Sequence, residues 1–190
     1  MKSIASRLPL LCLPFLAGTL SVHADDNVAT NGDFEKAAAA GDWPEGWAKP
    51  KAGGEWGKEG TNRFLSLKTV TPNEMVMMYH EFKIPAGSKK LEISWKQRVT
   101  GLKRGAQPWF DARILLEWAN ADRVKISGKP KAPNVSKDTT GWEEKSITID
   151  VPEYAAFLQF MPCLFQAEAG TFDLDDIVVK VLEVPAADPQ

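Results

Sequence analysis

The sequence has 190 residues, of which 44% are hydrophobic and 25% charged, and its formal net charge is -2 at pH 7. This composition is typical of a globular domain and excludes a long disordered chain or a fibrous repeat. A slightly acidic chain also lacks the basic surface that nucleic-acid binding requires, so we expect no nucleic-acid partner.

The first 24 residues have the pattern of a cleaved export signal. Lys2 and Arg7 form a positive start, an apolar run follows from Leu8 to Leu20, and Val22-His23-Ala24 resembles a cleavage site. The apolar run is too short to cross a hydrocarbon core of about 30 Å as a helix, so we expect no membrane span. The pattern therefore predicts a secreted or periplasmic protein.

The remaining chain suffices for one domain that buries roughly 70% of its unfolded surface. We predict three parts: a signal peptide over 1–24, a β-sandwich over 25–184 and a flexible tail over 185–190. After cleavage Cys163 is the single cysteine, so no internal disulfide is possible. Its apolar surroundings predict a buried thiol.

Apolar and polar residues alternate along much of the chain, which is the period of a β-strand. Clusters of Gly, Pro and Asn separate the alternating segments, and one short helical turn is expected at 33–40. About eight strands in this length predict an all-β fold, a two-sheet antiparallel β-sandwich with a jelly-roll arrangement. The expected strands are 63–68, 75–84, 91–96, 111–118, 146–151, 155–165 and 177–181.

An ordered set of motifs resembles a known family. Asn31-Gly-Asp-Phe-Glu35 and then Trp43-Pro-Glu-Gly-Trp47 open the domain, Trp142 precedes a strand, and Gly170-Thr-Phe-Asp-Leu-Asp-Asp-Ile177 begins the last strand. This set resembles the carbohydrate-binding modules of the CenC type (the family 4/9 group), which share a galactose-binding-like jelly roll. The resemblance implies an exported protein that holds a polysaccharide or oligosaccharide without catalysis.

Such modules usually accompany a glycoside hydrolase. We expect this chain to be free-standing, because one sandwich uses up its length. Glycan-active enzymes or surface proteins are further candidate partners.

The resemblance also implies a structural calcium ion that joins the first and last strands. The matching residues are Glu35 and Asp175 or Asp176. By strand alternation Asp175 shares the side of Ile177 and Val179, so we expect it to point inward, where an unpaired carboxylate costs several kcal/mol. Calcium binds oxygen ligands and would compensate this charge. The alternative is a carboxylate that accepts hydrogen bonds from backbone amides.

Seven tryptophans are present, and indole rings stack on the apolar faces of sugars. Trp95 and Trp118 fall on the same side of their strands as Ile93 and Ile114, so we expect them in the core. Trp47 and Trp142 match family positions that look structural. The candidate ligand platforms that remain are Trp43, Trp56 and Trp109.

Polar residues that alternate with the core give a second candidate set. Arg98, Arg113 and Glu117 fall on the outer sides of predicted strands, and Gln159 and Met161 join them from 155–165. In the resembling family, the concave outer face of the jelly roll is the usual glycan cleft. The alternative is a solvated sheet face with cross-strand salt bridges.

Two other functions are kept as alternatives. One is a surface or periplasmic β-sandwich that binds proteins and no sugar, and a less favoured one is a small jelly-roll lyase or hydrolase. Tyr79, His80, Gln97 and Arg98 are residue types that a lyase needs, but Gln97 and Arg98 are adjacent in a strand and should face opposite ways. We therefore predict a binding protein rather than an enzyme.

Overall fold

A computed structural model describes residues 27–183, so the predicted signal peptide and the tail after 184 lie outside the described residues. Within this range the chain is all-β, and it has no helix that could span a membrane. The helical turn expected at 33–40 is wrong, because this segment forms turns and one bridge. The Asn31 side chain accepts a hydrogen bond from the Lys36 amide and donates to the Lys36 carbonyl, so a helical turn cannot use these groups.

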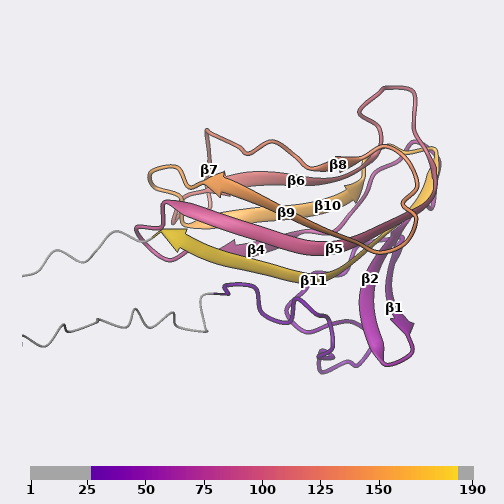
Figure 1. Ribbon diagram of the computed structural model, residues 1–190, viewed down its shortest axis with the longest axis horizontal. Coiled ribbons are helices and arrows are strands. Elements are labelled where there is room, and N and C mark those ends of the chain that lie inside the picture. The colour runs from indigo at the N-terminus through magenta and orange to yellow at the C-terminus, as the bar shows by residue number, and fades with distance from the viewer. Residues whose placement is uncertain (1–26, 184–190) are drawn as a thin grey trace, which may run out of the picture.

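The strands form two antiparallel sheets, as the alternation predicts (Figure 1). One sheet has the order β1-β2-β11-β5-β9. The other has the order β3-β10-β6-β7, with β4 also paired to β10 and β8 to β6. The bounds are β1 Gly54–Glu59, β2 Asn62–Lys68, β3 Val76–Met77, β4 His80–Lys83, β5 Lys90–Lys103, β6 Ala112–Ala119, β7 Lys125–Ile126, β8 Asn134–Val135, β9 Glu143–Asp150, β10 Phe157–Leu164 and β11 Ala169–Glu183.

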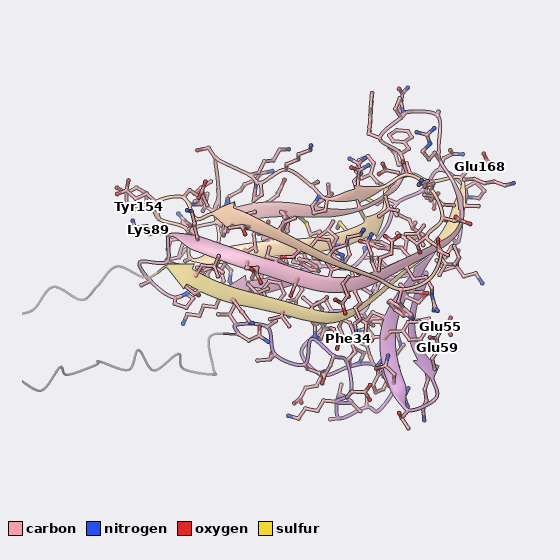
Figure 2. The ribbon with its side chains drawn as sticks, viewed as in Figure 1. Phe34, Glu55, Glu59, Lys89, Tyr154 and Glu168 are labelled. Atoms are coloured by element: carbon pink, nitrogen blue, oxygen red, sulfur yellow. The ribbon has the colours of Figure 1, made fainter. Side chains whose placement is uncertain are left out.

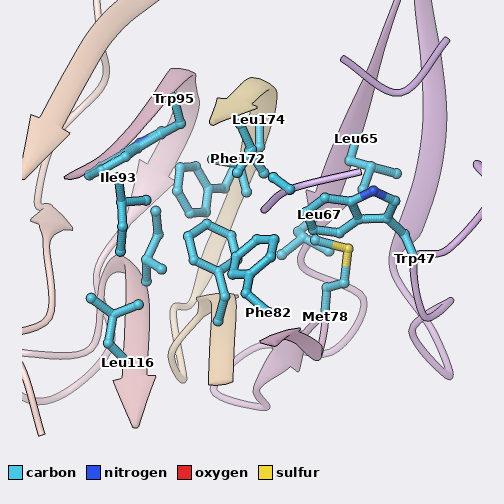
Figure 3. Close-up of a cluster of buried hydrophobic side chains, with 14 of the residues drawn as sticks. Trp47, Leu65, Leu67, Met78, Phe82, Ile93, Trp95, Leu116, Phe172 and Leu174 are labelled. Atoms are coloured by element: carbon cyan, nitrogen blue, oxygen red, sulfur yellow. The ribbon is translucent and has the colours of Figure 1, made fainter. Parts of the chain in front are cut away.

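The core lies between the two sheets and is filled by the inward residues of each strand (Figure 3). Phe82 of β4 lies in the middle of this cluster, between Met78 on one side and Phe172 of β11 on the other. Trp95 and Trp118 are both buried, which confirms their predicted place in the core. Residues that precede β1 add Phe34 and two indoles to the same cluster.

Strand β1 is not among the strands that the alternation predicts, and it lies in a segment rich in glycine. Gly57 pairs with Phe64 of β2, and a Cβ atom at Gly57 would lie 2.5 Å from the Phe64 ring. The glycine therefore makes room for the ring and does not loosen the chain.

A β-bulge in β11 changes which way the predicted metal ligands point. Asp175 pairs with Lys96 of β5, but the next pair joins Val178 to Ser94, so β11 has one extra residue. Asp176 is in the left-handed region with φ 48°. The expectation that Asp175 points into the core with Ile177 is therefore wrong, because one inserted residue reverses the alternation.

The five-stranded sheet curls so strongly that its two edges meet. Neighbouring strands are about 4.8 Å apart, so β1 and β9 would be roughly 19 Å apart in a flat sheet. Glu59 at the end of β1 nevertheless pairs with Arg98 of β5 at 2.6 Å and accepts a hydrogen bond from Trp142, next to β9, at 3.2 Å. The outer side of this sheet is thus concave, and Figure 1 shows β1 and β2 running steeply across β5 and β11.

The opening motif lies against the bulge. The Ile177 amide donates to the Gly32 carbonyl at 2.9 Å, and a Cβ atom at Gly32 would lie 1.9 Å from the Ile177 carbonyl oxygen. Any side chain at Gly32 therefore separates the two backbones.

We expect Gly32→Ala to lower the free energy of unfolding by roughly 2–4 kcal/mol, because the backbone contact must open. Gly141→Ala is the matched control, since a Cβ atom there would meet nothing within 4 Å. Urea denaturation of both variants checks this. Equal stability of the two variants would contradict the contact.

His80 is enclosed by aromatic rings on the core side of β4. Its ring stacks on Trp47 with centroids 4.0 Å apart and meets the edge of Phe82. Burial lowers the pKa of His80 from 6.5 to about 4.

This shift predicts a loss of stability in acid. Between pH 6.5 and 4 the unfolded chain binds a proton at His80 while the folded chain does not, so falling pH favours unfolding by up to about 3 kcal/mol. His80→Phe removes the titrating group and should flatten the pH dependence in this window. Denaturation curves of the two proteins from pH 7 to 4 test this, and parallel curves would refute it.

Candidate functional site

Three of the predicted polar residues lie on one outer surface, which we call the β4-β10-β6 face. It consists of the outward side chains of these strands and of Tyr79, which precedes β4. Gln159 of β10 pairs with Glu81 of β4 on one side and with Glu117 of β6 on the other, so the three form a polar row across the strands. The next row, in continued register, is Tyr79, Met161 and Leu115.

Hydrogen bonds fix the side chains of the polar row. Glu81 Oε1 accepts from the Tyr79 hydroxyl at 2.6 Å and from Gln159 Nε2 at 3.3 Å. Glu117 pairs with Lys125 of β7. Burial, and then the bond to Glu81, raises the pKa of Tyr79 to about 12, so its hydroxyl stays protonated at neutral pH.

Polar and apolar groups alternate on this face in a way that suits a sugar. The carboxylates and the amide can exchange hydrogen bonds with hydroxyls, and the Tyr79 ring, 38% exposed as a residue, offers an apolar surface beside Met161.

Arg113 lies further along the same face, toward Trp109. Its guanidinium pairs with the buried Asp111 at 2.6 Å and lies over the Phe165 ring at 5.5 Å. Trp109 is 53% exposed and meets the edge of Phe110, which in turn packs against Phe165. Trp109 is thus the predicted indole that solvent reaches most freely.

The opposite end of the sandwich has its own exposed aromatic residue. Tyr154 is 78% exposed and has a left-handed backbone with φ 67°. Figure 2 shows Tyr154 at the far end of the sandwich from Glu168. The segment that contains Trp109 begins near Glu168, because the Glu168 amide donates to the carbonyl of Lys103, the last residue of β5.

Arg98 belongs to a different surface from the other predicted polar residues. It lies on β5, and β5 and β6 are in different sheets, so their outward faces are on opposite sides of the sandwich. The alternation placed Arg98 and Arg113 correctly with respect to the core. It could not place them with respect to each other, because that depends on strand order.

Two of the predicted indoles are held by other protein groups. Trp43 is only 5% exposed and packs in the core, so its ring offers no free face to solvent. Trp56 is partly buried, donates from Nε1 to the Phe34 carbonyl at 2.9 Å, and has the Arg63 guanidinium 4.0 Å from its ring centroid. In the described structure both rings therefore serve packing.

The three predicted calcium ligands each have a protein partner. Glu35 accepts from the Arg63 amide at 2.7 Å, and Asp175 accepts from Asn62 and from the Asp176 amide, both at 2.8 Å. Asp176 pairs with Lys96 at 2.8 Å. Between residues 27 and 183, no group of three or more His, Cys, Asp or Glu is placed to hold a metal ion. Calcium binding stays a prediction.

The residue types that a lyase would need are scattered. His80 is stacked on Trp47, and Gln97 is buried and accepts from Trp95, while Arg98 faces outward on the same strand. Tyr79 lies on the other sheet.

Glu81 is not among the site residues predicted from the sequence. The strand at 75–84 was expected, so its alternation was the signal that could have pointed to Glu81.

No known family profile and no curated protein matches the chain. Solved structures do. The enzymatically active domain of bacteriophage CBA120 tailspike protein 4 matches with a TM-score of 0.60 at 9% identity over 83% of this chain, which spans only 22% of that chain. A family 4 carbohydrate-binding module (CBM4) matches with a TM-score of 0.52 at 16% identity, covering 80% of this chain and 97% of that one.

The CBM22-1 xylan-binding domain of Paenibacillus barcinonensis Xyn10C has a TM-score of 0.51 at 16% identity, covering 85% of this chain and 97% of that one. At these identities the likeness establishes the fold and does not single out the CenC type. The chain is a two-sheet antiparallel β-sandwich of the kind found in carbohydrate-binding modules.

Proposed function

We propose that this protein binds a polysaccharide or oligosaccharide on the β4-β10-β6 face, and that it does so without making or breaking a bond. The observation that supports this most directly is the polar row Glu81, Gln159 and Glu117 beside the row of Tyr79, Met161 and Leu115. Hydroxyls would meet the first row, and the apolar side of a sugar ring would meet the second.

The fixed side chains favour binding. The Tyr79, Glu81 and Gln159 side chains already bond to one another, so less rotamer entropy is lost when a ligand arrives. The face runs along β10 from Gln159 toward Phe165, roughly 20 Å at 3.4 Å per residue, so a chain of several sugar units fits better than a single one. Trp109 lies at the end of this path. The export signal predicted from the sequence supports a secreted or periplasmic site of action.

Tyr79→Ala and Gln159→Ala should each weaken glycan binding about tenfold, because each removes a group that contacts the sugar. Tyr154→Ala is the matched control, because Tyr154 is the second tyrosine and lies in the segment before β10, outside the three strands that form this face. Affinity electrophoresis through gels that contain β-glucan, xylan or alginate measures the effect.

Three results would contradict the proposal. One is no retardation in any gel, and a second is retardation that both variants retain. The third is the appearance of new reducing ends or unsaturated products, which would indicate an enzyme.

Trp109→Ala tests how far the ligand extends. Loss of retardation in this variant, in addition to Tyr79→Ala and Gln159→Ala, would show that the ligand extends along the whole face.

We also propose a structural calcium ion at Glu35, Asp175 and Asp176. The ion would have to replace the Asn62 and Lys96 contacts, and it would stabilise Asp175, whose pKa burial raises.

Protein purified without chelator should contain calcium by elemental analysis and should lose several degrees of melting temperature in excess chelator. Asp176→Asn should reduce both effects. A calcium-free protein, or a calcium-loaded one whose melting temperature the chelator does not change, would rule out this brace.

A further inference from the structure

A hollow lies on the concave side of the five-stranded sheet, on the opposite side of the sandwich from the β4-β10-β6 face. It has a volume of about 330 Å³ and is lined by Asn62, Lys96, Trp142, Glu144 and Asp175. We call it the Trp142 hollow. A neighbouring hollow of about 440 Å³ shares Lys96 and Glu144 with it. The volume of the Trp142 hollow is at the lower end of the range for small-ligand pockets.

The indole that walls this hollow is held in one orientation. The Arg98 guanidinium lies 4.6 Å from the Trp142 ring centroid, and Phe64 meets the ring edge-on with centroids 5.4 Å apart. Trp142 Nε1 donates to Glu59 at 3.2 Å. Figure 2 shows Glu59 on the β1-β2 hairpin, which curls over this side of the sheet. A ring fixed in this way binds a ligand without first losing rotamer freedom.

The charges that face the hollow are unbalanced toward negative. Lys96 is the one cation in its lining, and it is already paired with Asp176 at 2.8 Å. Asp175 is bonded only to neutral donors, namely Asn62 and the Asp176 amide. Glu144 lies opposite Lys96 on β9 and interacts with its charge, but no close ion pair joins Glu144 to a cation in the described part of the chain.

The charged residues bonded to one another beside Trp142 increase this excess of negative charge. Arg98 shares its charge between Glu59 and Asp173, both through close pairs of 2.6 and 2.7 Å. Asp173 is buried, and its Oδ1 has no hydrogen-bond partner among the described residues. A cation in the hollow would therefore enter a negative field in partly desolvated surroundings.

We propose that the Trp142 hollow binds the ammonium group of an amine-bearing sugar unit. An aromatic wall beside two carboxylates is the arrangement that recognises an organic ammonium ion, through the ring quadrupole and charge-assisted hydrogen bonds. Asp175 and Glu144 receive the ammonium group, Asn62 bonds to a hydroxyl, and the apolar side of the sugar ring lies along Trp142. This site is separate from the β4-β10-β6 face, so each can fail without the other. It shares Asp175 with the proposed calcium ion, so the ammonium group and calcium exclude each other at that carboxylate.

The test compares three trisaccharides that differ at one group: glucosamine, N-acetylglucosamine and glucose trimers joined in the same way. Chelator-treated protein is titrated with each by calorimetry and by NMR of the indole N–H signals. The glucosamine trimer should bind at least about tenfold more tightly than the other two, because only it has a cation. The Trp142 indole signal should shift with it.

Glu144→Gln should reduce this affinity about tenfold, since it removes one carboxylate from an exposed position and leaves the fold intact. Glu143→Gln is the matched control, because Glu143 is the adjacent acid, pairs with Lys145 and does not line the hollow. Tyr79→Ala should leave glucosamine binding unchanged, which separates this site from the proposed glycan face.

Equal affinity for the acetylated and free-amine trimers would overturn the proposal. So would a Glu144→Gln protein that binds the amine as tightly as the Glu143→Gln protein does. A lysine tripeptide that binds more tightly than the glucosamine trimer would overturn the assignment to a sugar and indicate a basic protein partner.

Discussion

The one extra residue in β11 determines both how the opening motif packs against the last strand and which side chains line the Trp142 hollow. Without the bulge at Asp176, Asp175 and Ile177 would lie on the same side of the sheet. With it, Ile177 turns inward and meets the backbone of Gly32, while Asp175 turns outward and lines the Trp142 hollow. A single left-handed residue thus gives one strand an apolar inner side for the core and a charged outer side.

The two outer faces of the sandwich differ in how their charges are satisfied. On the β4-β10-β6 face each carboxylate that we name has a cationic partner, as in the pairs of Glu81 with Arg123 and Glu117 with Lys125. On the curled sheet the acids outnumber the bases, and one buried oxygen of Asp173 has no partner. The first face therefore suits neutral hydroxyls, and the second favours a cation. Their separation by the full thickness of the core allows both to be occupied at once.

The sequence predicted the sheets well because alternation reports directly on which side of a strand is buried. It placed Trp95 and Trp118 in the core and predicted strands where β2, β5, β6, β9, β10 and β11 lie, whereas the segment 75–84, expected as one strand, forms the two short strands β3 and β4. The prediction failed at β1, because the sequence does not show that the Phe64 ring of the neighbouring strand occupies the space where a side chain at Gly57 would lie. It also failed at Asp175, because an inserted residue leaves no mark in a pattern of period two.

The candidate site was harder to predict than the fold. Arg113, Glu117 and Gln159 lie on one face, but Arg98 is on the other side of the molecule, since the consecutive strands β5 and β6 belong to different sheets. Trp43 and Trp56 were selected from loop-like surroundings, yet the segment before β1 folds back so that Trp43 packs in the core and Trp56 bonds to Phe34. Such contacts depend on the path of the chain through space, which local composition does not contain.

The reactivity of the free thiol of Cys163 can report on local opening of the domain. The thiol lies on the outer side of β10, covered between Met77 of β3 and Arg113 of β6, and burial raises its pKa to about 12. Strand β3 covers it with only two residues, so that edge of the sheet is held by few hydrogen bonds. A thiol reagent reaches Cys163 only when this edge separates, so its rate of reaction measures how often the sandwich opens at that edge without unfolding elsewhere.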